Sequence, residues 1–592
     1  MTFVQPSSDR GQKSTLNVGR TNKPLIFMLI VTLTMMGGIG ARLAYLQIIQ
    51  GQQNRELAQN NHIRLIPKLP VRGNLLDRKG RLLAGNRLTY SVFLWPMAPK
   101  QPDWQKTKER LSQVLNMKPE EITQLLAKAG YNPSMRVRLA RNITPAQITA
   151  LAEYGNDLDG VEVDIEALRS YPNGEIAAHV LGYTGEMSNE ELTKRRSEGY
   201  RLGDFVGQMG VEAAFEKQLR GEWGGQQVEV DGSGQIVRIL GQKESKPGQD
   251  VHLTLDLDVQ KAAEKALGNR QGAIIAMNPE NGAILAMASR PTFDPNIFSK
   301  RISPETWENI QRKDHPFVNR ALRGFPPAST FKIITTTAAI ESGKFSENTR
   351  LQTYASLTIA GRKFADWNLA GFGVLGFAGA LKWSSDTFFY QIAQEIGRET
   401  LIDWTHKYGF GQKTGIELAP EEAAGLVADE TWKRKRLREP WTVGDTVNMS
   451  IGQGFLQATP LQQGVMFAVA ANGGYRVKPH LLKDDEESKQ WRESLNLKPQ
   501  TIRVLRQGLR AVVDGGTGGA LNSPTIPAAA GKSGTAEAPP KASHVWFGGY
   551  APADKPEIVV VAFGEHEGAK GGGGAIAAPM VLKVMEAYFN KQ

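Results

Sequence analysis

The first strong hydrophobic pattern in the chain is an uncharged run close to its start. Residues 24–41 contain no charged side chain, and the apolar character continues to residue 46. A helix of this length can cross a hydrocarbon core of about 30 Å. Lysine and arginine dominate the charge of the preceding segment, which favours a cytoplasmic N-terminus. We therefore predict a cytoplasmic tail over residues 1–23 and a transmembrane anchor over residues 24–46. A cleaved signal peptide and a buried core helix are the alternatives.

Beyond the anchor, the pattern alternates between helical and strand-like stretches as far as residue 250. Two apolar pairs flank Asp77-Arg78-Lys79-Gly80, which predicts a hairpin with a structural turn. Residues 104–117 and 119–129 have helical apolar spacing, and Thr144-Pro145 marks another helix start. Residues 160–250 are rich in glycine and strand-like. We predict an elongated, mixed α/β pedestal without catalytic function over residues 47–250.

The pattern from residue 251 onward indicates a second domain that ends at residue 592. Its expected strands and helices come from runs that are apolar on one or both faces: strand 251–256, helix 259–267, hairpin 272–277 with 283–287, strands 530–535, 545–550 and 558–563, and helix 577–588. Strands therefore occur at both ends of this region, and its middle is helical. This arrangement predicts a layered α/β domain.

A helix in that middle region begins at the only Ser-x-x-Lys sequence of the chain, Ser329 to Lys332. Apolar residues on both of its faces predict burial nearly all round: Phe331, Ile333, Ile334, Ala338 and Ile340. Positions i and i+3 meet on one helix face, so the Lys332 amine can reach the Ser329 hydroxyl. A serine becomes a nucleophile when an adjacent base takes its proton, and a desolvated lysine can be that base.

Two further polar stations follow the Ser329 helix along the sequence. Ser384-Ser385-Asp386 precedes an aromatic run, and Lys532-Ser533-Gly534-Thr535 lies in a strand-like stretch. Each is weak alone, because such residues commonly form caps and turns. Ser-x-x-Lys, Ser-x-Asn and Lys-Thr-Gly in this order are the set used by active-site serine enzymes that bind penicillin. Three matching stations in one domain, behind a membrane anchor, indicate one catalytic site.

Composition is consistent with this interpretation and excludes several others. The formal net charge is +11, yet no long basic block or aromatic-interleaved basic motif indicates nucleic-acid binding. A basic protein beside anionic membrane or cell-wall polymer is the better interpretation. The chain has no cysteine, which excludes disulfides and thiolate chemistry. Its few, scattered histidines show no metal-ligand spacing, so we predict no cofactor and no metal.

On these motifs the sequence resembles the class B penicillin-binding proteins, and within them the elongation branch. The pedestal carries Arg72-Gly73, Arg169-Ser170-Tyr171-Pro172 and Gly207-Gln208-Met209-Gly210-Val211-Glu212. The catalytic part adds Ser450-Ile451-Gly452-Gln453-Gly454 to the three stations. The resemblance covers nearly the whole chain after the anchor. It implies a transpeptidase domain with a central antiparallel sheet, flanking helices and a helical subdomain.

The resemblance also implies a reaction and a role for each site residue. Ser329 would attack the carbonyl between the terminal D-alanines of a peptidoglycan stem peptide. Lys332 would act as base, which needs a pKa depressed by burial and a nearby cation, for which Lys532 is the candidate. Ser384 would pass the proton to the leaving nitrogen, and Asp386 would position Lys332 or the substrate.

The remaining expected contacts concern substrate recognition. Ser533 and Thr535, beside Gly534, would bind the terminal carboxylate together with Lys532. The backbone N–H groups of Ser329 and Thr535 would form the oxyanion hole. β-Lactams would acylate the same serine.

The chain departs from the family pattern at three places. Phe325 and Ala328 replace the more common tyrosine and glycine before the nucleophile, and Asp386 replaces the more common asparagine. The elongation branch often carries Gly-His-Gly upstream of the second station, whereas this chain has Gly371-Phe372-Gly373. The missing histidine puts a metal site there in doubt.

Several functional alternatives share the three stations. A septal transpeptidase is the first, and a penicillin sensor, a β-lactam hydrolase or a D,D-carboxypeptidase are the others. No glycosyltransferase domain is evident before residue 250. The resemblance therefore implies a partner that makes glycan strands, a SEDS-family glycosyltransferase of the RodA type, together with other elongation-complex proteins. The expected location is the bacterial inner membrane, with one pass and an extracytoplasmic catalytic domain.

Overall fold

The structure is a computed structural model that forms two compact units. It describes residues 23–50, 63–129, 136–201, 203–230, 236–299, 302, 304–312 and 314–590. One unit comprises the chain up to Leu69 together with Trp223–Glu244, and the other comprises Pro70–Glu222 and Ser245–Gln592.

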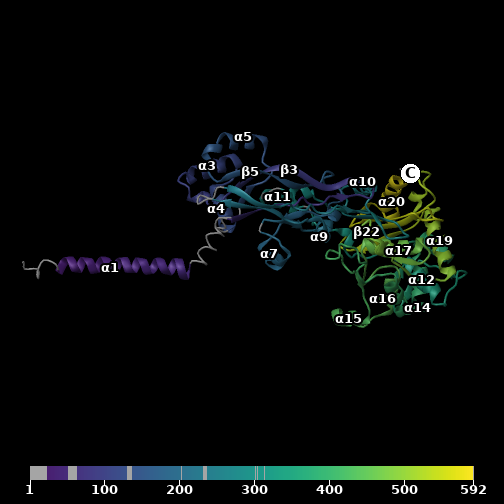
Figure 1. Cartoon of the computed structure of the whole chain (residues 1–592). Helices are drawn as coiled ribbons and strands as arrows, with labels where there is room; N and C mark the ends of the chain where they lie inside the picture. Colours follow the sequence, from purple (N-terminus) through teal and green to yellow (C-terminus); the bar gives the residue numbers. More distant parts are fainter. Residues whose placement is uncertain are drawn as a thin grey trace, which may run out of the picture. The chain divides into compact units, whose positions relative to one another are not determined.

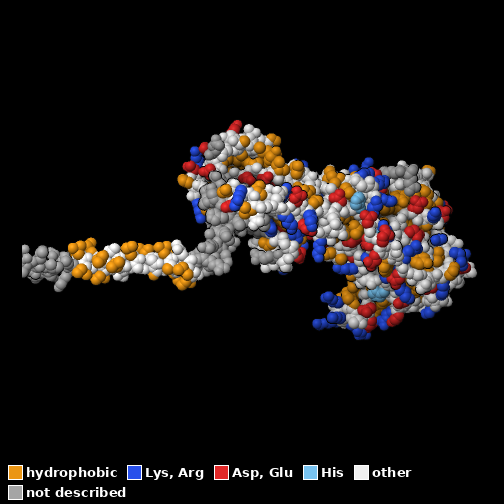
Figure 2. Space-filling model, viewed as in Figure 1, with side chains coloured by type: hydrophobic (Ala, Val, Ile, Leu, Met, Phe, Trp, Pro, Cys, Tyr) orange, Lys and Arg blue, Asp and Glu red, His pale blue; other side chains and the backbone are white. Residues whose placement is uncertain are grey.

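The first unit contains the apolar N-terminal helix and a small sheet. Helix α1 spans Lys23–Ala44 and continues as the π-helical turn η1, Tyr45–Ile49. The segment Pro24–Ile49 is long and apolar enough to cross a membrane, and its side chains are exposed (Figure 2). This helix contains the predicted anchor, whereas the predicted cytoplasmic tail lies almost wholly outside the described residues. The antiparallel sheet has the order β1-β8-β9: β1 Ile63–Lys68, β8 Gly224–Val230 and β9 Ile236–Lys243.

In the second unit, the part that precedes residue 253 is built on a five-stranded sheet. Its strands are β2 Leu75–Leu76, β3 Leu82–Leu94, β4 Val137–Ala140, β5 Val161–Ser170 and β10 Val251–His252. Strand β3 is central, because it pairs with β2, β4 and β5. The Asp77 carboxylate accepts hydrogen bonds from Arg81 and from backbone N–H groups of the turn, so the predicted hairpin is a structural turn.

Three helices cover this sheet (Figure 1), and together with its strands they enclose a separate hydrophobic cluster. They are α3 Trp104–Leu115, α4 Pro119–Ala129 and α5 Pro145–Glu153. Helix α5 begins at the predicted position, where the Thr144 hydroxyl accepts the N–H of Gln147 in a capping box. Leu111, Ile122 and Leu139 are buried between helices and sheet, which explains the helical apolar spacing seen in the sequence.

The glycine-rich stretch after β5 is more helical than its sequence suggests. The following elements interrupt it: α6 Ala178–Leu181, β6 Thr184–Glu186, α7 Asn189–Arg195, β7 Phe205–Gly207, α8 Gly210–Ala214 and α9 Glu216–Leu219. The helices are short, so no extended apolar period reveals them. The strand expected over residues 251–256 is present but shorter, because β10 stops at His252. Asp256 then caps helix α10, Leu257–Leu267.

A buried ion network lies beneath α8. Glu212 is fully buried and accepts hydrogen bonds from Arg72 Nε at 2.7 Å and from Arg169 Nε at 2.6 Å. Tyr171 donates its hydroxyl to the same carboxylate at 3.2 Å. Burial alone would raise the pKa of Glu212, but the charges of Arg169 and Arg72 outweigh it and lower that pKa. The network joins three segments that are far apart in sequence.

The catalytic part is organised around a second five-stranded antiparallel sheet. Its order is β12-β11-β23-β22-β21, with β11 Gly272–Met277, β12 Ile284–Arg290, β21 Ala530–Ala538, β22 Lys541–Ala551 and β23 Ile558–Gly564. The predicted hairpin of β11 and β12 is confirmed, and both strands are buried on both faces. Strands from the two ends of the region therefore meet in one sheet.

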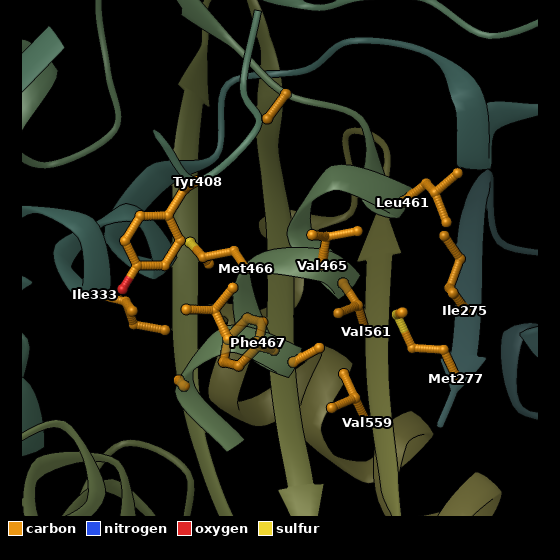
Figure 3. Close-up of a cluster of buried hydrophobic side chains, with 14 of the residues drawn as sticks. Ile275, Met277, Ile333, Tyr408, Leu461, Val465, Met466, Phe467, Val559 and Val561 are labelled. Carbon is orange, nitrogen blue, oxygen red and sulfur yellow. The ribbon is translucent and has the colours of Figure 1, made fainter. Parts of the chain in front are cut away.

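Helices cover both faces of this sheet. On one face, α10 and α20, Gly573–Phe589, pack on Ile274, Val560 and Ala562. On the other face, α17, Pro460–Ala471, places Val465 beside Val561 of β23 (Figure 3) and Phe467 over Gly548 of β22. Alternate residues of a strand point to opposite faces, so neighbouring valines of β23 belong to different clusters. Val561 of the α17 face is labelled in Figure 3.

The segment between β12 and β21 is largely helical, as predicted. Its main helices are α11 Pro304–Gln311, α12 Lys332–Glu341, α13 Phe377–Trp383, α14 Asp386–Lys407, α15 Glu430–Leu437, α16 Val443–Ser450 and α19 Pro499–Val513. Four short strands precede α13: β13 Arg350–Gln352, β14 Ser356–Ile359, β15 Arg362–Ala365 and β16 Val374–Gly376. The predicted fold class is confirmed: an apolar N-terminal helix, a mixed pedestal, and a domain of antiparallel sheet and helices.

Candidate active site

Ser329 lies in a short 3-10 turn that leads directly into helix α12. The turn, η7, spans Ala328–Phe331, and the Ser329 side chain is half-buried. Ala328 has a φ of 54°, which residues other than glycine rarely adopt. Its N–H donates to Gly452 O at 2.9 Å. A Cβ on Gly452 would lie 2.1 Å from Ala328 O, so only glycine fits there. The Ser-Ile-Gly segment thus supports the backbone that presents Ser329.

Lys332 is fully buried one turn after Ser329, as the pattern of the helix predicts. Its Nζ donates to Asp386 Oδ1 at 2.6 Å and to the Ser384 carbonyl at 2.8 Å. It also donates to Ser384 Oγ at 3.3 Å and lies 5.4 Å from the centroid of the Phe389 ring. The Nζ of Lys332 therefore joins the first station to the second, through its contacts with Ser384 and Asp386.

Ser384 occupies the junction between α13 and α14 in the left-handed backbone region, with φ 55° and ψ 37°. This conformation lets both its carbonyl and its hydroxyl approach Lys332. Its Oγ accepts hydrogen bonds from Lys332 Nζ and, at 2.9 Å, from Lys532 Nζ. A hydroxyl has two acceptor sites and one donor proton. The two lysines fill the acceptor sites, so the Ser384 proton is left free to be donated.

Lys532 brings the third station into the same cluster from strand β21. It is fully buried and donates to Ser384 Oγ and to Ser533 O at 3.0 Å. Burial, with the neighbouring charge of Lys332, holds the pKa of Lys532 well below its ordinary value. The lysine–serine–lysine arrangement therefore places two amines on one hydroxyl.

A carboxylate pair completes the second station. Burial raises the pKa of Asp386, although Lys332 acts to lower it, and Asp366 adds to the rise. Asp366 is buried, and its Oδ2 accepts hydrogen bonds from Ser385 Oγ at 2.8 Å and from Thr387 N and Oγ1, each at 3.0 Å. These bonds hold the residues on both sides of Asp386.

The remaining residues of the third station lie along β21. The Ser533 hydroxyl donates to Thr517 Oγ1 at 2.8 Å, so in this structure its proton is already in use. Thr535 is exposed, and its Oγ1 accepts the N–H of Gly573 at 3.2 Å. A Cβ on Gly573 would lie 2.3 Å from Gly534 O, which explains a glycine at the start of α20. The N-terminus of α20 thus backs the strand that carries Lys532.

Sequence reasoning missed Asp366 and Thr517. Both lie in segments without a recognisable motif, and only their contacts with Ser385, Thr387 and Ser533 reveal them. No signal in the single sequence marks Asp366, because acidic residues are common in turns. The pattern Ser-Ile-Gly-Gln-Gly did mark Gly452, although its packing against Ala328 was not predictable.

The position where the branch often carries histidine is occupied by an aromatic cluster. Phe372 is stacked on Trp383 with ring centroids 6.1 Å apart, and it contacts Trp367 at 5.4 Å. Within the described ranges, no group of three or more His, Cys, Asp or Glu residues could hold a metal ion. Phenylalanine offers no ligand atom, so the residues at this place do not fit a metal.

Replacing Lys532 by methionine should separate its chemical role from its structural one. The pKa of Lys532 is lower in the folded than in the unfolded chain. Its burial therefore opposes folding as pH falls below the unfolded value of about 10.4, and the penalty is absent above it. Lys532→Met should leave the unfolding temperature at pH 7.5 unchanged or higher, while acylation by penicillin falls about 10²–10³-fold.

The measurement is differential scanning fluorimetry together with acylation kinetics. Lys541→Met, which removes an exposed lysine from the neighbouring strand, is the matched control. A variant that loses stability but keeps its acylation rate would contradict both parts of the prediction.

Comparison with known proteins now identifies the family. The model of the penicillin-binding protein transpeptidase domain matches residues 272–586, and that of the penicillin-binding protein dimerisation domain matches residues 67–253. These models together cover most of the chain. The chain belongs to the class B penicillin-binding proteins, and the resemblance found in the sequence is confirmed.

Individual relatives narrow the comparison to one branch. The peptidoglycan D,D-transpeptidase MrdA of Acinetobacter baumannii is 32% identical over 97% of this chain and 88% of its own. The solved complex between PBP2 and MreC from Helicobacter pylori shares 30% identity and a TM-score of 0.81, covering 89% of this chain and 99% of that one. A structure of a peptidoglycan synthase complex that coordinates polymerization and crosslinking shares 31% identity and a TM-score of 0.72, covering 96% of this chain and 99% of that one.

Proposed function

We propose that this protein is a serine-type peptidoglycan D,D-transpeptidase that cross-links stem peptides through an acyl-enzyme. The observation that carries the proposal is the Ser384 hydroxyl, which accepts hydrogen bonds from both Lys332 and Lys532. A hydroxyl held in this way can receive a proton from one lysine while it donates its own to a leaving group. The relationship to MrdA supports the same reaction.

In the first half-reaction, Ser329 Oγ forms a bond with the carbonyl carbon between the two terminal D-alanines. Lys332, as the neutral amine, takes the Ser329 proton. The C–N bond then breaks, and the leaving D-alanine nitrogen receives the proton of Ser384, which is replaced from Lys332. The N–H groups of Ser329 and Thr535 stabilise the oxyanion.

In the second half-reaction, the amine of another stem peptide attacks the acyl carbon. It loses a proton through the same relay, and Ser329 leaves with its proton restored. A penicillin forms the same ester with Ser329, but its ring-opened product has no leaving group that departs. Asp386 positions Lys332 throughout. Thr535 binds the terminal carboxylate beside Gly534 and Lys532, and Ser533 joins it by exchanging its hydrogen bond to Thr517 for one to the carboxylate.

The physiological role we propose is cell elongation. The similarity to MrdA and to PBP2 supports this role over that of a septal transpeptidase. It also favours a transpeptidase over a penicillin sensor or a D,D-carboxypeptidase. Residues 47–250 then form the pedestal, and residues 251–592 form the catalytic domain.

The proposed partners and location follow from the same relatives. One solved relative is bound to MreC, and another is part of a peptidoglycan synthase complex. By analogy, this chain would work with a SEDS-family glycosyltransferase of the RodA type and with elongation-complex proteins. Its helix α1 would anchor it as a single-pass protein of the bacterial inner membrane, with the catalytic domain outside the cytoplasm.

Labelling of the solubilised full chain with a fluorescent penicillin tests the reaction. Trypsin cleaves after Arg323 and Lys332, so the nine-residue peptide between these sites should carry the mass of the opened drug. The label should persist for hours, whereas rapid release would indicate a hydrolase. Label on any other serine would overturn the assignment of the nucleophile.

Depletion of the protein in its host tests the physiological role separately. Rounded cells are the expected result, since loss of side-wall cross-linking removes cell shape. Filamentous cells would instead show a septal function while leaving the proposed reaction intact.

A further inference from the structure

An exposed aromatic surface adjoins the second station and has no part in the reaction described above. It consists of Trp367, Leu369, Phe372 and Trp383, which we call the aromatic platform. Trp367 is 59% exposed and Trp383 37%, and Phe372 contacts both rings; Leu369, two residues after Trp367, is 81% exposed. Exposed apolar clusters of this kind are typical of surfaces that bind a ligand or partner.

Hydrogen bonds hold the backbone of the platform in one conformation. Asn368 accepts the N–H of Ala370 at 3.1 Å and donates to Gly371 O at 2.7 Å. Phe372 donates its N–H to Thr353 Oγ1 at 2.8 Å. These hydrogen bonds hold the loop that presents the platform, so binding there would require little ordering of the chain.

The platform is physically continuous with the catalytic cluster. The Trp367 indole N–H donates to the Trp383 carbonyl at 3.0 Å, and Trp383 directly precedes Ser384. Asp366, the residue before Trp367, accepts hydrogen bonds from Ser385 and Thr387. A molecule that lies on the platform is thus beside the station whose serine contacts both catalytic lysines.

We propose that the aromatic platform binds a pyranose ring of the peptidoglycan glycan strand, an N-acetylated amino sugar that bears a reacting stem peptide. The inference rests on the proposed transpeptidase function. A flat ring of Trp367 complements the apolar C–H face of a pyranose, and aromatic side chains are the usual anchors of such sites. A stem peptide of five residues spans at most about 18 Å, so the sugar that bears it lies within that reach of the catalytic serine.

Charge favours the sugar over the peptide as the occupant. Stem peptides carry carboxylates, whereas the four side chains of the platform are uncharged. The Nζ of Lys382 lies 5.1 Å from the centroid of the Trp383 ring, but this lysine is not one of the four platform residues. A neutral ring with polar substituents at its edge is the part of the substrate that fits an uncharged aromatic face.

Competition against a fluorescent penicillin tests the proposal without requiring turnover. The full chain is acylated in the presence of a pentapeptide ending in D-Ala–D-Ala, or of the same pentapeptide attached to its disaccharide. The readout is the concentration of each competitor that halves the acylation rate. We expect the disaccharide form to compete about tenfold better in the unsubstituted chain, and Trp367→Ala to abolish this difference. Competition by the free pentapeptide should change less than about twofold.

Two further variants separate sugar binding from an indirect effect on Ser384. Trp367→Phe loses the N–H that donates to Trp383 but retains an aromatic face. If the face binds the sugar, this variant should keep most of the preference for the disaccharide. Tyr475→Ala removes an exposed aromatic ring from another hairpin and should behave like the unsubstituted chain.

Each remaining outcome overturns the inference in a recognisable way. A preference that survives Trp367→Ala shows that the sugar binds elsewhere. Equal weakening of both competitors shows that Trp367 acts through the second station or binds the peptide. Absence of any preference in the unsubstituted chain shows that no sugar site exists. Failure of penicillin to acylate the unsubstituted chain would instead refute the proposed function itself.

Discussion

Replacement of Lys332 by methionine is expected to lower the acylation rate by about 10⁴-fold, the upper range for a positioned general base. The buried amine lies one helical turn after Ser329 and is held by Asp386, Ser384 O and Ser384 Oγ, which supports its role as the base. Methionine is unbranched and of similar length, and it fills the buried space without a charge. The measurement is the second-order rate constant of acylation by a fluorescent penicillin.

The fold should survive this substitution. Asp386 loses a hydrogen-bond donor, but burial raises its pKa, so the carboxyl can be protonated instead of remaining charged. Unfolding curves of the variant should therefore lie close to those of the unsubstituted chain. Ser329→Ala, which should give no covalent label, defines the zero of the assay.

A matched lysine provides the control. Lys344, just beyond the C-terminal end of α12, is exposed, and Lys344→Met should leave the acylation rate within about twofold. A rate for Lys332→Met within tenfold of the unsubstituted chain would exclude Lys332 as the base. In that case the amine of Lys532, whose pKa is depressed, would be the remaining candidate.

The sequence predicts the helix of Ser329 and the buried hairpin well for a simple reason. Both are local patterns in which apolar residues mark buried faces, at every position of β11 and on both faces of α12 up to Ile340. Motif order then indicates that the three stations belong together. The strand order of the sheet does not follow from such patterns, because β11 pairs with β23 from the far end of the domain.

The details that make the site work depend on contacts that no local pattern encodes. Ser384 reaches both lysines because its backbone is left-handed, a property that a serine in sequence does not reveal. Asp366 supports the second station across a loop and carries no motif. The protonation balance also depends on burial, since the pKa values of Lys532 and Asp386 shift for that reason first.

The residues of the pedestal that the sequence marked as family motifs have a structural explanation. Arg72, Arg169 and Glu212 stand far apart in the chain, and folding joins them in one buried ion network. Their recurrence as motifs therefore reflects a shared fold requirement, in contrast to the catalytic stations.

Substitution of Glu212 by alanine is expected to lower the free energy of unfolding by about 3–5 kcal/mol, as for the loss of one partner of a buried ion pair. Glu212 accepts hydrogen bonds from Arg72, Arg169 and Tyr171, and two of these partners are buried or nearly buried cations. Without the carboxylate, the guanidinium of Arg169 keeps its charge in a buried site. Urea unfolding followed by intrinsic fluorescence measures the change.

The pH dependence of stability gives an independent readout of the same group. The pKa of Glu212 is lower in the folded than in the unfolded chain, so its contribution is fully present above the unfolded value of about 4.3. That contribution is lost as the pH falls through the folded value. Glu212→Ala should therefore lose less stability than the unsubstituted chain between neutral pH and strongly acidic pH.

Two variants control for charge and for surface effects. Glu212→Gln keeps a hydrogen-bond acceptor without the charge and should be destabilised by less than Glu212→Ala. Glu190→Ala, at an exposed site on α7, should change the free energy of unfolding by less than about 0.5 kcal/mol. An unchanged unfolding curve for Glu212→Ala would show that the arginines find other partners, and that the network does not hold the three segments together.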